Sequence, residues 1–297
     1  MKLGIIGLGK MGKAIAYRVL QANHEVIGYD RDETVLRDAE KIGVSPAKNI
    51  EEITKQTNII WIMVPPGDTV DAVLTKLHKL LPAGSIIIDG GNSKFTQSIE
   101  RAEICKKLSI RFLDCGTSGG LRGQTTGFSL MIGGDHNAYE EIKSLLQAIA
   151  APNGYGYMGE SGTGHYVKMV HNGIEYALMQ AYADGFNLLK NGHFKNLDLA
   201  NIASVWRNGS VIRSWLLELI HEILMNDQDL KDISGEVAES GMGRWTVEDA
   251  QEHNIPIPLI EDALAIRYWS QKTGGNYSTK IVALLRHKFG GHAVKKL

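Results

Sequence analysis

The sequence predicts an α/β Rossmann-type dinucleotide-binding domain followed by an all-α domain. Three observations lead to this prediction. Short β-branched runs alternate with longer amphipathic stretches through about residue 158, a GxGxxG motif directly follows the first run, and strand signals stop after Gly164. We therefore expect a dinucleotide-binding domain over residues 1–160 and a helical domain over residues 161–297.

The first part of the chain has the pattern of βαβ units, in which parallel strands form a sheet and the intervening helices cover it. Strands are expected at residues 3–6, 25–29, 58–64, 85–89, 110–114, 128–132 and 155–158. This order predicts a mainly parallel sheet with helices on both faces.

The second part is predicted to be helical. Residues 165–189 contain no proline, and apolar side chains recur at helical spacing between Val167 and Ala181. Further helices are expected at residues 199–207, 211–225, 246–253, 259–272 and 279–288.

Composition and charge narrow the classes of function. The chain has 297 residues, with 32 Lys and Arg against 33 Asp and Glu, so its formal net charge is −1. Without a strong overall field it is not expected to bind nucleic acid or an anionic membrane, and an anionic ligand needs a local cluster of cations. The longest apolar run, residues 59–64, is too short to span a bilayer, and Cys105 and Cys115 have neither disulfide-framework nor zinc-ligand spacing. We expect a cytoplasmic protein without a metal site.

The glycine motif comprises Gly7, Leu8, Gly9, Lys10, Met11 and Gly12. It follows the first expected strand and begins an amphipathic helix, which is the context in which such a motif binds a dinucleotide. The first glycine permits a tight turn, the second lets a pyrophosphate approach the backbone, and the third lets helix and strand pack closely. We predict that the pyrophosphate of a nicotinamide dinucleotide binds here.

The choice between NAD and NADP depends on residues 30–32. Asp30 ends the second expected strand, where a carboxylate accepts hydrogen bonds from the ribose hydroxyls and repels a 2′-phosphate. Arg31 complicates the assignment because a guanidinium can pair with that phosphate or stack on adenine. Asp32 adds a second negative charge, so NAD is favoured.

The long helix that begins the second part carries polar residues on one face. Lys168, His171, Asn172 and Glu175 are related by helical spacing, and the seven residues from Lys168 to Glu175 correspond to about 10 Å along the axis. This face offers a base and an acid with an imidazole and an amide between them. A solvated helix face is the alternative interpretation.

Two polar, glycine-rich turns follow expected strands at residues 89–93 and 116–120. Open α/β sheets bind ligands at the carboxyl ends of their strands, so both turns are candidates for ligand contact. Ordinary connections between strand and helix are the alternative.

Five stretches together resemble the decarboxylating 6-phosphogluconate dehydrogenases over nearly the whole chain. They are GLGKMG at 7–12, IIDGGNS at 87–93, TSGG at 117–120, GHYVKMVHNGIEY at 164–176 and FGGH at 289–292. Related β-hydroxyacid dehydrogenases share the nucleotide motif, the SGG turn and a catalytic lysine. The run HNGIEY beside the lysine resembles the phosphogluconate enzymes in particular.

The resemblance implies oxidative decarboxylation of 6-phosphogluconate to ribulose 5-phosphate and CO₂, with NAD as hydride acceptor, in the pentose phosphate pathway. Lys168 would be the general base that takes the proton of the 3-hydroxyl and then donates it to the carbonyl oxygen as CO₂ leaves. Glu175 would protonate C1 of the resulting enediol, and no metal is needed.

The remaining site residues are also implied by the resemblance. On the cofactor side, Val64 and Asn92 join the glycine motif, Asp30 and Arg31. Substrate contacts are assigned to Asn92, Ser118, Gly119, Gly120, His171, Asn172, Tyr176, Arg213, Arg286 and His292.

Two departures from the family pattern bear on this assignment. Longer relatives carry a phosphate-binding lysine where this chain has Ser240, so the phosphate is expected to be held either more weakly or by a different set of residues. Longer relatives also duplicate the helical half, which implies that this chain forms a homodimer or homotetramer. In that assembly Arg286 and His292 of the C-terminal tail would complete a neighbouring site.

Two other functions remain open on the sequence. One is a 3-hydroxyacid dehydrogenase that acts on an unphosphorylated substrate without decarboxylation. The other is a dinucleotide-binding regulator that has lost turnover, although the presence of both Lys168 and Glu175 argues against it.

Overall fold

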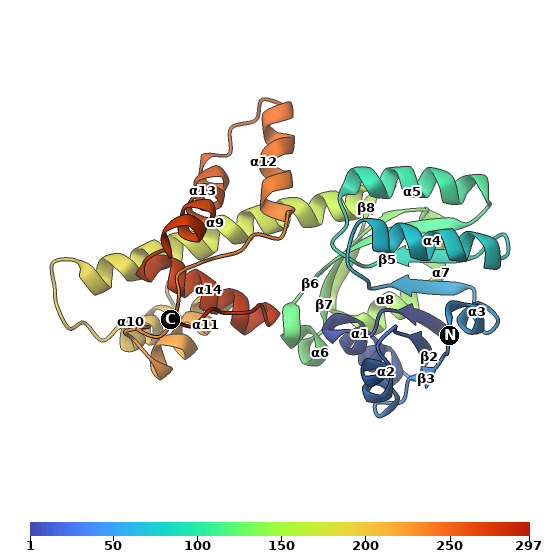
Figure 1. The fold of residues 1–297 in the computed structure, drawn as a ribbon, viewed down its shortest axis with the longest axis horizontal. Coiled ribbons are helices and arrows are strands. Elements are labelled where there is room, and N and C mark those ends of the chain that lie inside the picture. Colours follow the sequence, from blue (N-terminus) through green and yellow to red (C-terminus); the bar gives the residue numbers. More distant parts are fainter. The chain divides into compact units, whose positions relative to one another are not determined.

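The structure, a computed structural model, describes residues 1–297, which form two compact units, Met1–Met169 and Val170–Leu297 (Figure 1). Helix α9 (Thr163–Asn191) begins in the first unit and ends in the second. The boundary expected near residue 160 falls between the last strand, β8 (Ala150–Gly159), and this helix.

Unit 1 is built on one eight-stranded sheet with the strand order β3-β2-β1-β4-β5-β6-β7-β8. The other strands are β1 (Lys2–Ile6), β2 (Glu25–Tyr29), β3 (Ser45–Pro46), β4 (Ile59–Ile62), β5 (Ile86–Asp89), β6 (Arg111–Ser118) and β7 (Phe128–Gly134). All neighbours pair in parallel except β6 and β7. Residues 119–127 between these two strands are too few for a parallel crossover, so the chain reverses. The predicted fold class is confirmed.

Helices cover both faces of this sheet, and for that reason β4 and β5 are buried at every position. The helices are α1 (Lys10–Gln21), α2 (Glu33–Glu40), α3 (Ile50–Thr54), α4 (Asp68–Leu80), α5 (Phe95–Lys107), α6 (Gly123–Thr126), α7 (His136–Glu141) and α8 (Lys143–Ile149). One apolar core includes Ile15 of α1 and Leu146 of α8, and a second includes Ile53 of α3 and Leu74 of α4. Through these two apolar cores the sheet packs against the helices on both of its faces.

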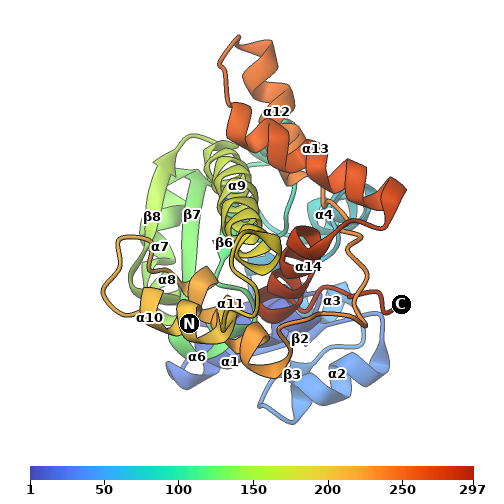
Figure 2. The ribbon, with the colours of Figure 1, turned by 90° about the vertical axis from the view of Figure 1, so that its left-hand side faces the viewer.

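Unit 2 consists of the second part of α9 and five further helices. These are α10 (Leu199–Trp206), α11 (Trp215–Asn226), α12 (Met242–Glu252), α13 (Pro258–Thr273) and α14 (Tyr277–Gly290). Figure 2 looks nearly along α9 and shows α13 and α14 beside it. Gln180 of α9 donates a hydrogen bond to Ser278 of α14 at 2.8 Å, and Met179 and Phe186 of α9 lie in the core of the unit.

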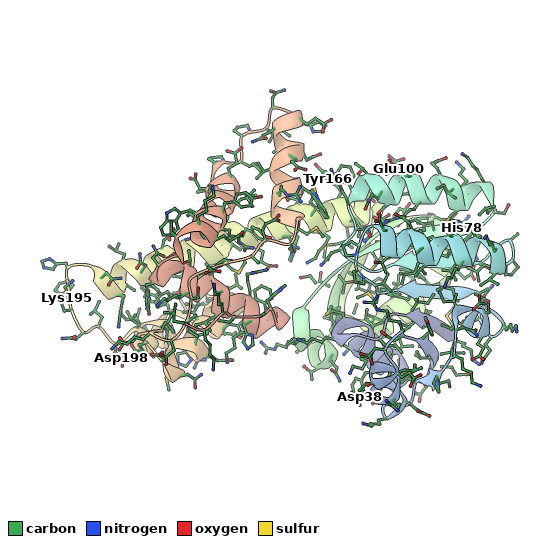
Figure 3. All side chains as sticks on the ribbon, viewed as in Figure 1. Asp38, His78, Glu100, Tyr166, Lys195 and Asp198 are labelled. Atoms are coloured by element: carbon green, nitrogen blue, oxygen red, sulfur yellow. The ribbon has the colours of Figure 1, made fainter.

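Side-chain caps explain where several of these helices begin. Asp198, labelled in Figure 3, accepts a hydrogen bond from the backbone of Asn201 and starts α10. Ser214 likewise accepts a hydrogen bond from the backbone N–H of Leu217, so α11 starts at Trp215. The apolar spacing predicted a start at residue 211. None of the helices combines the length and the hydropathy that a membrane-spanning segment requires.

Candidate active site

The glycine turn between β1 and α1 has the geometry that its sequence predicts. Gly7 has a φ of +94°, and a Cβ there would lie 2.4 Å from the carbonyl oxygen of Met63. A Cβ on Gly12 would lie 2.0 Å from the carbonyl oxygen of Gly7. At Gly9, by contrast, a Cβ would meet nothing within 4 Å. The first and third glycines therefore permit the turn and its packing, and the second leaves space at the N-terminus of α1.

Asp30 follows β2 and is tied to the glycine turn. Its Oδ2 accepts a hydrogen bond from the backbone N–H of Leu8 at 2.7 Å, and its Oδ1 accepts one from Asp32 at 3.0 Å. A carboxylate has further lone pairs, so Asp30 can still accept hydrogen bonds from ribose hydroxyls. Asp32 caps α2 through Thr34, and Arg31 is exposed beside it.

The other cofactor and substrate loops lie at the same edge of the sheet, because β1, β4, β5 and β6 run parallel. Val64 follows β4, and its Cγ1 lies 3.1 Å from the position of a Cβ on Gly7. Asn92 follows β5 and is exposed, whereas Ser118 ends β6. Gly119 and Gly120, with φ values of +131° and +54°, continue from it. The structure thus brings the predicted loop residues to one edge.

Lys168 is only 5% exposed and packs against β6. A Cβ on Gly116 would lie 2.3 Å from the Cβ of Lys168, so only glycine allows this approach. The carboxylate of Asp114 accepts backbone hydrogen bonds from Gly162 at 2.7 Å and His165 at 2.8 Å, at the start of α9. These contacts fix Lys168 beside the carboxyl end of β6.

The next turns of α9 carry the other polar residues of the predicted face. His171 Nδ1 lies 3.0 Å from Asn172 Oδ1 and 3.9 Å from Glu175 Oε2. The side chain of Glu175 is 24% exposed. Because α9 is continuous from Thr163 to Asn191, the axial distance from Lys168 to Glu175 is about 10 Å, as the helical rise requires.

A buried cluster of cations lies around Tyr176 within unit 2. Arg267 of α13 places its guanidinium over the Tyr176 ring, with Cζ 3.2 Å from the ring centroid. Arg267 is 2% exposed, and its two terminal nitrogens have no hydrogen-bond partner. The Tyr176 hydroxyl lies 3.4 Å from Ser240 Oγ. Orphaned donors of this kind are costly unless a ligand satisfies them.

Arg286 of α14 belongs to the same cluster. It is 8% exposed, and its charge acts on Arg267 and interacts with Tyr176, Glu175 and Glu239. Burial lowers the pKa of both arginines, and Arg286 lowers that of Arg267 further. In its own chain Arg286 lies in this cluster, and its expected contribution to a neighbouring site stays a prediction.

Two other residues predicted for phosphate binding lie in exposed segments. Arg213 is exposed in the turn before α11, and His292 is exposed after α14. The carbonyl oxygen of His292 lies 2.8 Å from His287 Nδ1. The contacts that define the cluster around Tyr176 involve neither residue, so their roles remain predictions.

Arg267 was not among the predicted site residues, although its sequence context contains a signal. Ala263, Leu264, Arg267 and Ser270 are the buried positions of α13 and follow helical spacing. A charged residue on an otherwise buried stripe needs a partner or a ligand. Arg267 could therefore have been selected from the pattern of its own helix.

The fold and the site together define a class of protein, the nicotinamide-dinucleotide oxidoreductases with a Rossmann-type domain and a helical substrate domain. Comparison with known families narrows this class. Residues 2–171 match the NAD binding domain of 6-phosphogluconate dehydrogenase, and residues 164–292 match the C-terminal domain of 6-phosphogluconate dehydrogenase. The chain belongs to the 6-phosphogluconate dehydrogenase family.

Individual relatives agree with this membership. The NAD(+)-dependent, decarboxylating 6-phosphogluconate dehydrogenase of Haloferax volcanii is 46% identical over 301 residues, which cover 100% of this chain and 99% of the relative. The structure of 6-phosphogluconate dehydrogenase from Plasmodium falciparum superposes on this chain with a TM-score of 0.83 at 30% identity. The aligned region covers 92% of this chain and 62% of the Plasmodium chain. The 3-hydroxyisobutyrate dehydrogenase of Mycobacterium tuberculosis, at 20% identity and a TM-score of 0.75, shares the fold.

Proposed function

We propose that this chain catalyses the oxidative decarboxylation of 6-phosphogluconate to ribulose 5-phosphate and CO₂, with reduction of NAD, as a step of the pentose phosphate pathway. The observation that carries the proposal is the buried pair Arg267 and Arg286 beside Tyr176. Tyr176 follows Glu175 on α9, so an anion-binding cluster lies next to a candidate acid.

The residues of unit 1 fit a nicotinamide dinucleotide. The open space at Gly9, in front of the α1 N-terminus, suits a pyrophosphate, and Asp30 suits the ribose hydroxyls. We assign Leu8, Lys10, Met11, Arg31, Val64 and Asn92 to the same site. The carboxylate of Asp30 would repel a 2′-phosphate, which supports NAD over NADP. When bound, the nicotinamide accepts the hydride from C3 of the substrate.

Lys168 is proposed as the general base. A lysine must be neutral to accept a proton, and Lys168 is buried beside the carboxyl end of β6. Neutral Lys168 removes the proton of the 3-hydroxyl as the hydride leaves C3, which gives a 3-keto acid. The ammonium then donates its proton to the keto oxygen while the C1–C2 bond breaks, CO₂ leaves and an enediol forms.

Glu175 is proposed as the acid that protonates C1 of the enediol. C1 of the enediol is the former C2 of the substrate and is bonded to the carbon whose oxygen Lys168 protonates. The side chains of Lys168 and Glu175 therefore have to converge on neighbouring atoms across their axial distance of about 10 Å. His171 and Asn172 lie between them on the same helix and are assigned to substrate hydroxyls. Ser118, Gly119 and Gly120 are assigned to the carboxyl end of the substrate.

The phosphate is proposed to bind Arg267 and Arg286, with the Tyr176 hydroxyl as a further donor. A guanidinium can bind a phosphate through two parallel hydrogen bonds, and both terminal nitrogens of Arg267 have none within the chain. Ser240, which stands where longer relatives have a lysine, contacts Tyr176. Ser240 thus supplies a hydroxyl where those relatives have a charge, and Arg267 and Arg286 are the cations proposed for the phosphate.

A substrate panel tests the proposal. Purified protein is assayed with NAD and with NADP on 6-phosphogluconate, gluconate and 3-hydroxyisobutyrate. We expect turnover on 6-phosphogluconate with NAD and at least a hundredfold lower kcat/KM on gluconate, which lacks the phosphate. Preferred turnover of an unphosphorylated acid would identify a 3-hydroxyacid dehydrogenase. Tight NAD binding without turnover on any acid would identify a regulator.

We further propose that the chain assembles as a homodimer or homotetramer and acts in the cytoplasm. A groove of about 850 Å³ between α9 and α13 is lined by the exposed apolar side chains Ile174, Leu178, Leu259 and Trp269. A second copy is the proposed occupant, because the longer Plasmodium falciparum relative, of which this chain covers only 62%, contains additional chain that could cover such a face. Two free, buried cysteines agree with a reducing compartment.

The proposed assembly also has a role for the tail. Arg286 is proposed above to bind the phosphate in its own chain, so His292 and the residues after it are proposed to complete the neighbouring site. Mixed oligomers of Lys168→Met and His292→Ala chains test this role. Activity that appears only on mixing supports a shared site, and two inactive partners that stay inactive would contradict it.

A further inference from the structure

Arg101 lies on α5, outside the residues assigned to cofactor and substrate, and is 3% exposed. We propose that Arg101 is a positioning residue that holds two ligand-binding loops in place, the loop after β4 that carries Val64 and the loop after β5 that carries Asn92. The inference rests on the proposed roles of these two loops. No contact between Arg101 and a ligand is required.

Arg101 contacts the first loop at its C-terminal end, where the loop joins α4. Arg101 donates a hydrogen bond from one terminal nitrogen to the carbonyl oxygen of Gly67 at 3.3 Å, and from Nε to the carboxylate of Asp71 at 2.8 Å. Gly67 precedes α4 with a φ of +84°, and Asp71 lies in the first turn of that helix. Arg101 therefore fixes the point at which the loop containing Val64 joins α4.

The second loop is held from both sides of Asn92. The other terminal nitrogen of Arg101 donates to Ser93 Oγ at 3.0 Å and lies 3.4 Å from Asp89 Oδ2. Ser93 Oγ also donates to Asp89 Oδ2 at 2.7 Å, and the backbone N–H of Gly91 donates to Asp89 Oδ1 at 3.1 Å. The residues before and after Asn92 are thus fixed and buried, while Asn92 itself is exposed.

Only an arginine can make this set of contacts. Each of its three nitrogens meets a different group, and these groups belong to α4, the first loop and the second loop. A lysine has one nitrogen and would keep the charge opposite Asp89 without bridging both loops. A buried ion pair often adds little stability compared with apolar packing, so its value here is the fixed geometry of the loops.

Two variants and one control test the inference. Arg101→Lys keeps the positive charge and removes the bridge. Ser93→Ala removes the link next to Asn92 and leaves Arg101 in place. Lys106→Gln, at an exposed position of the same helix, is the matched control. Wild type and variants are compared for KM, kcat, the Kd of NAD measured by protein fluorescence, and the melting temperature.

We expect Arg101→Lys to raise the KM for 6-phosphogluconate and the Kd of NAD roughly tenfold or more, and Ser93→Ala to raise them less. In amide hydrogen exchange, residues 64–71 and 90–94 should exchange faster in both variants, whereas β7 should not change. A lowered melting temperature with KM, Kd and loop exchange within twofold of wild type would overturn the proposal. If Arg101→Lys is not recovered as folded protein, Ser93→Ala is judged by the same criteria.

The experiment separates this inference from the proposed function. Wild-type protein without activity on 6-phosphogluconate would contradict the proposed function. The Kd of NAD and the loop exchange would still decide whether Arg101 holds the loops.

Discussion

At the scale of single residues, Lys168 carries the proposed proton transfers, so its removal should abolish the reaction and leave cofactor binding intact. Lys168→Met keeps a flexible side chain of similar length in the buried position. We expect kcat to fall by at least about a thousandfold, because general base catalysis of this kind contributes roughly 10²–10⁴ in rate. The Kd of NAD should change less than threefold. Lys190→Met, on the same helix, is the control, and near-normal turnover of Lys168→Met would remove the base assignment.

Arg267 and Arg286 can be tested separately from Arg213. We expect Arg267→Met and Arg286→Met each to raise the KM for 6-phosphogluconate by roughly ten- to a hundredfold, as the loss of charge-assisted hydrogen bonds predicts. Activity on gluconate should change little. Arg213→Met, at an exposed position, should leave both values within a few fold if the cluster around Tyr176 alone holds the phosphate. Equal KM values for wild type and Arg267→Met would contradict the phosphate assignment.

The residue scale also shows what sequence patterns could and could not provide. Lys168 and Glu175 follow from helical spacing, since two residues on one helix have a distance fixed by its geometry. Arg267 did not follow from a motif, and its role depends on α13 and α9 lying side by side. Arg213 was assigned to the phosphate through the family resemblance; it lies in an exposed turn, and its role stays a prediction.

At the scale of elements, the turn between β1 and α1 allows a matched pair of substitutions. Gly12→Ala should destabilise unit 1, because the new Cβ would lie 2.0 Å from the carbonyl oxygen of Gly7. Gly9→Ala should leave the fold intact, because its Cβ meets nothing within 4 Å, yet weaken NAD binding by filling the space in front of α1. Melting curves and NAD titrations check both variants. A Gly9→Ala protein with unchanged NAD affinity would mean that the pyrophosphate does not bind there.

The contact between α4 and α5 should make stability depend on pH. His78 of α4, labelled in Figure 3, has its Nε2 3.3 Å from Cys105 Sγ of α5. Burial lowers the pKa of His78 from its usual 6.5, and burial raises the pKa of Cys105 to about 12. The contact therefore joins a protonated Cys105 thiol and a neutral His78 imidazole. The stability from neutral His78 is complete above pH 6.5 and decreases as the pH falls toward its lowered pKa.

The measurement for this contact is the urea midpoint of unfolding between about pH 5 and pH 8 for wild type and His78→Gln. The wild-type midpoint should decrease below about pH 6.5, and part of that decrease should be absent in His78→Gln. Parallel curves for the two proteins would show that His78 does not contribute.

Most elements were predictable because apolar residues recur in them at regular spacing. Some boundaries, however, depend on capping contacts and turns that this spacing does not indicate. The expected helix at 211–225 begins at Trp215 because Ser214 caps it. The expected helix at 246–253 begins earlier, at Met242, after Gly241 turns with a φ of +92°. The two-residue strand β3 was missed because it is too short for alternation to be seen.

At the scale of the whole molecule, the cluster around Tyr176 is assembled from distant segments. Tyr176 lies on α9 and Ser240 in the segment before α12. Arg267 lies on α13 and Arg286 on α14. Their convergence is a property of tertiary packing and could not be derived from spacing along the chain. It also explains how a chain with a formal net charge of −1 can select a phosphorylated acid, since the few cations required are concentrated at one place.

The central claim, that oxidation and decarboxylation occur on one substrate, is tested most directly by stoichiometry. Purified protein is given limiting 6-phosphogluconate and excess NAD, and NADH and released CO₂ are measured in the same reaction. We predict that the two products appear in equal amounts, each equal to the substrate consumed. NADH formed without CO₂, or neither product formed, would contradict the account.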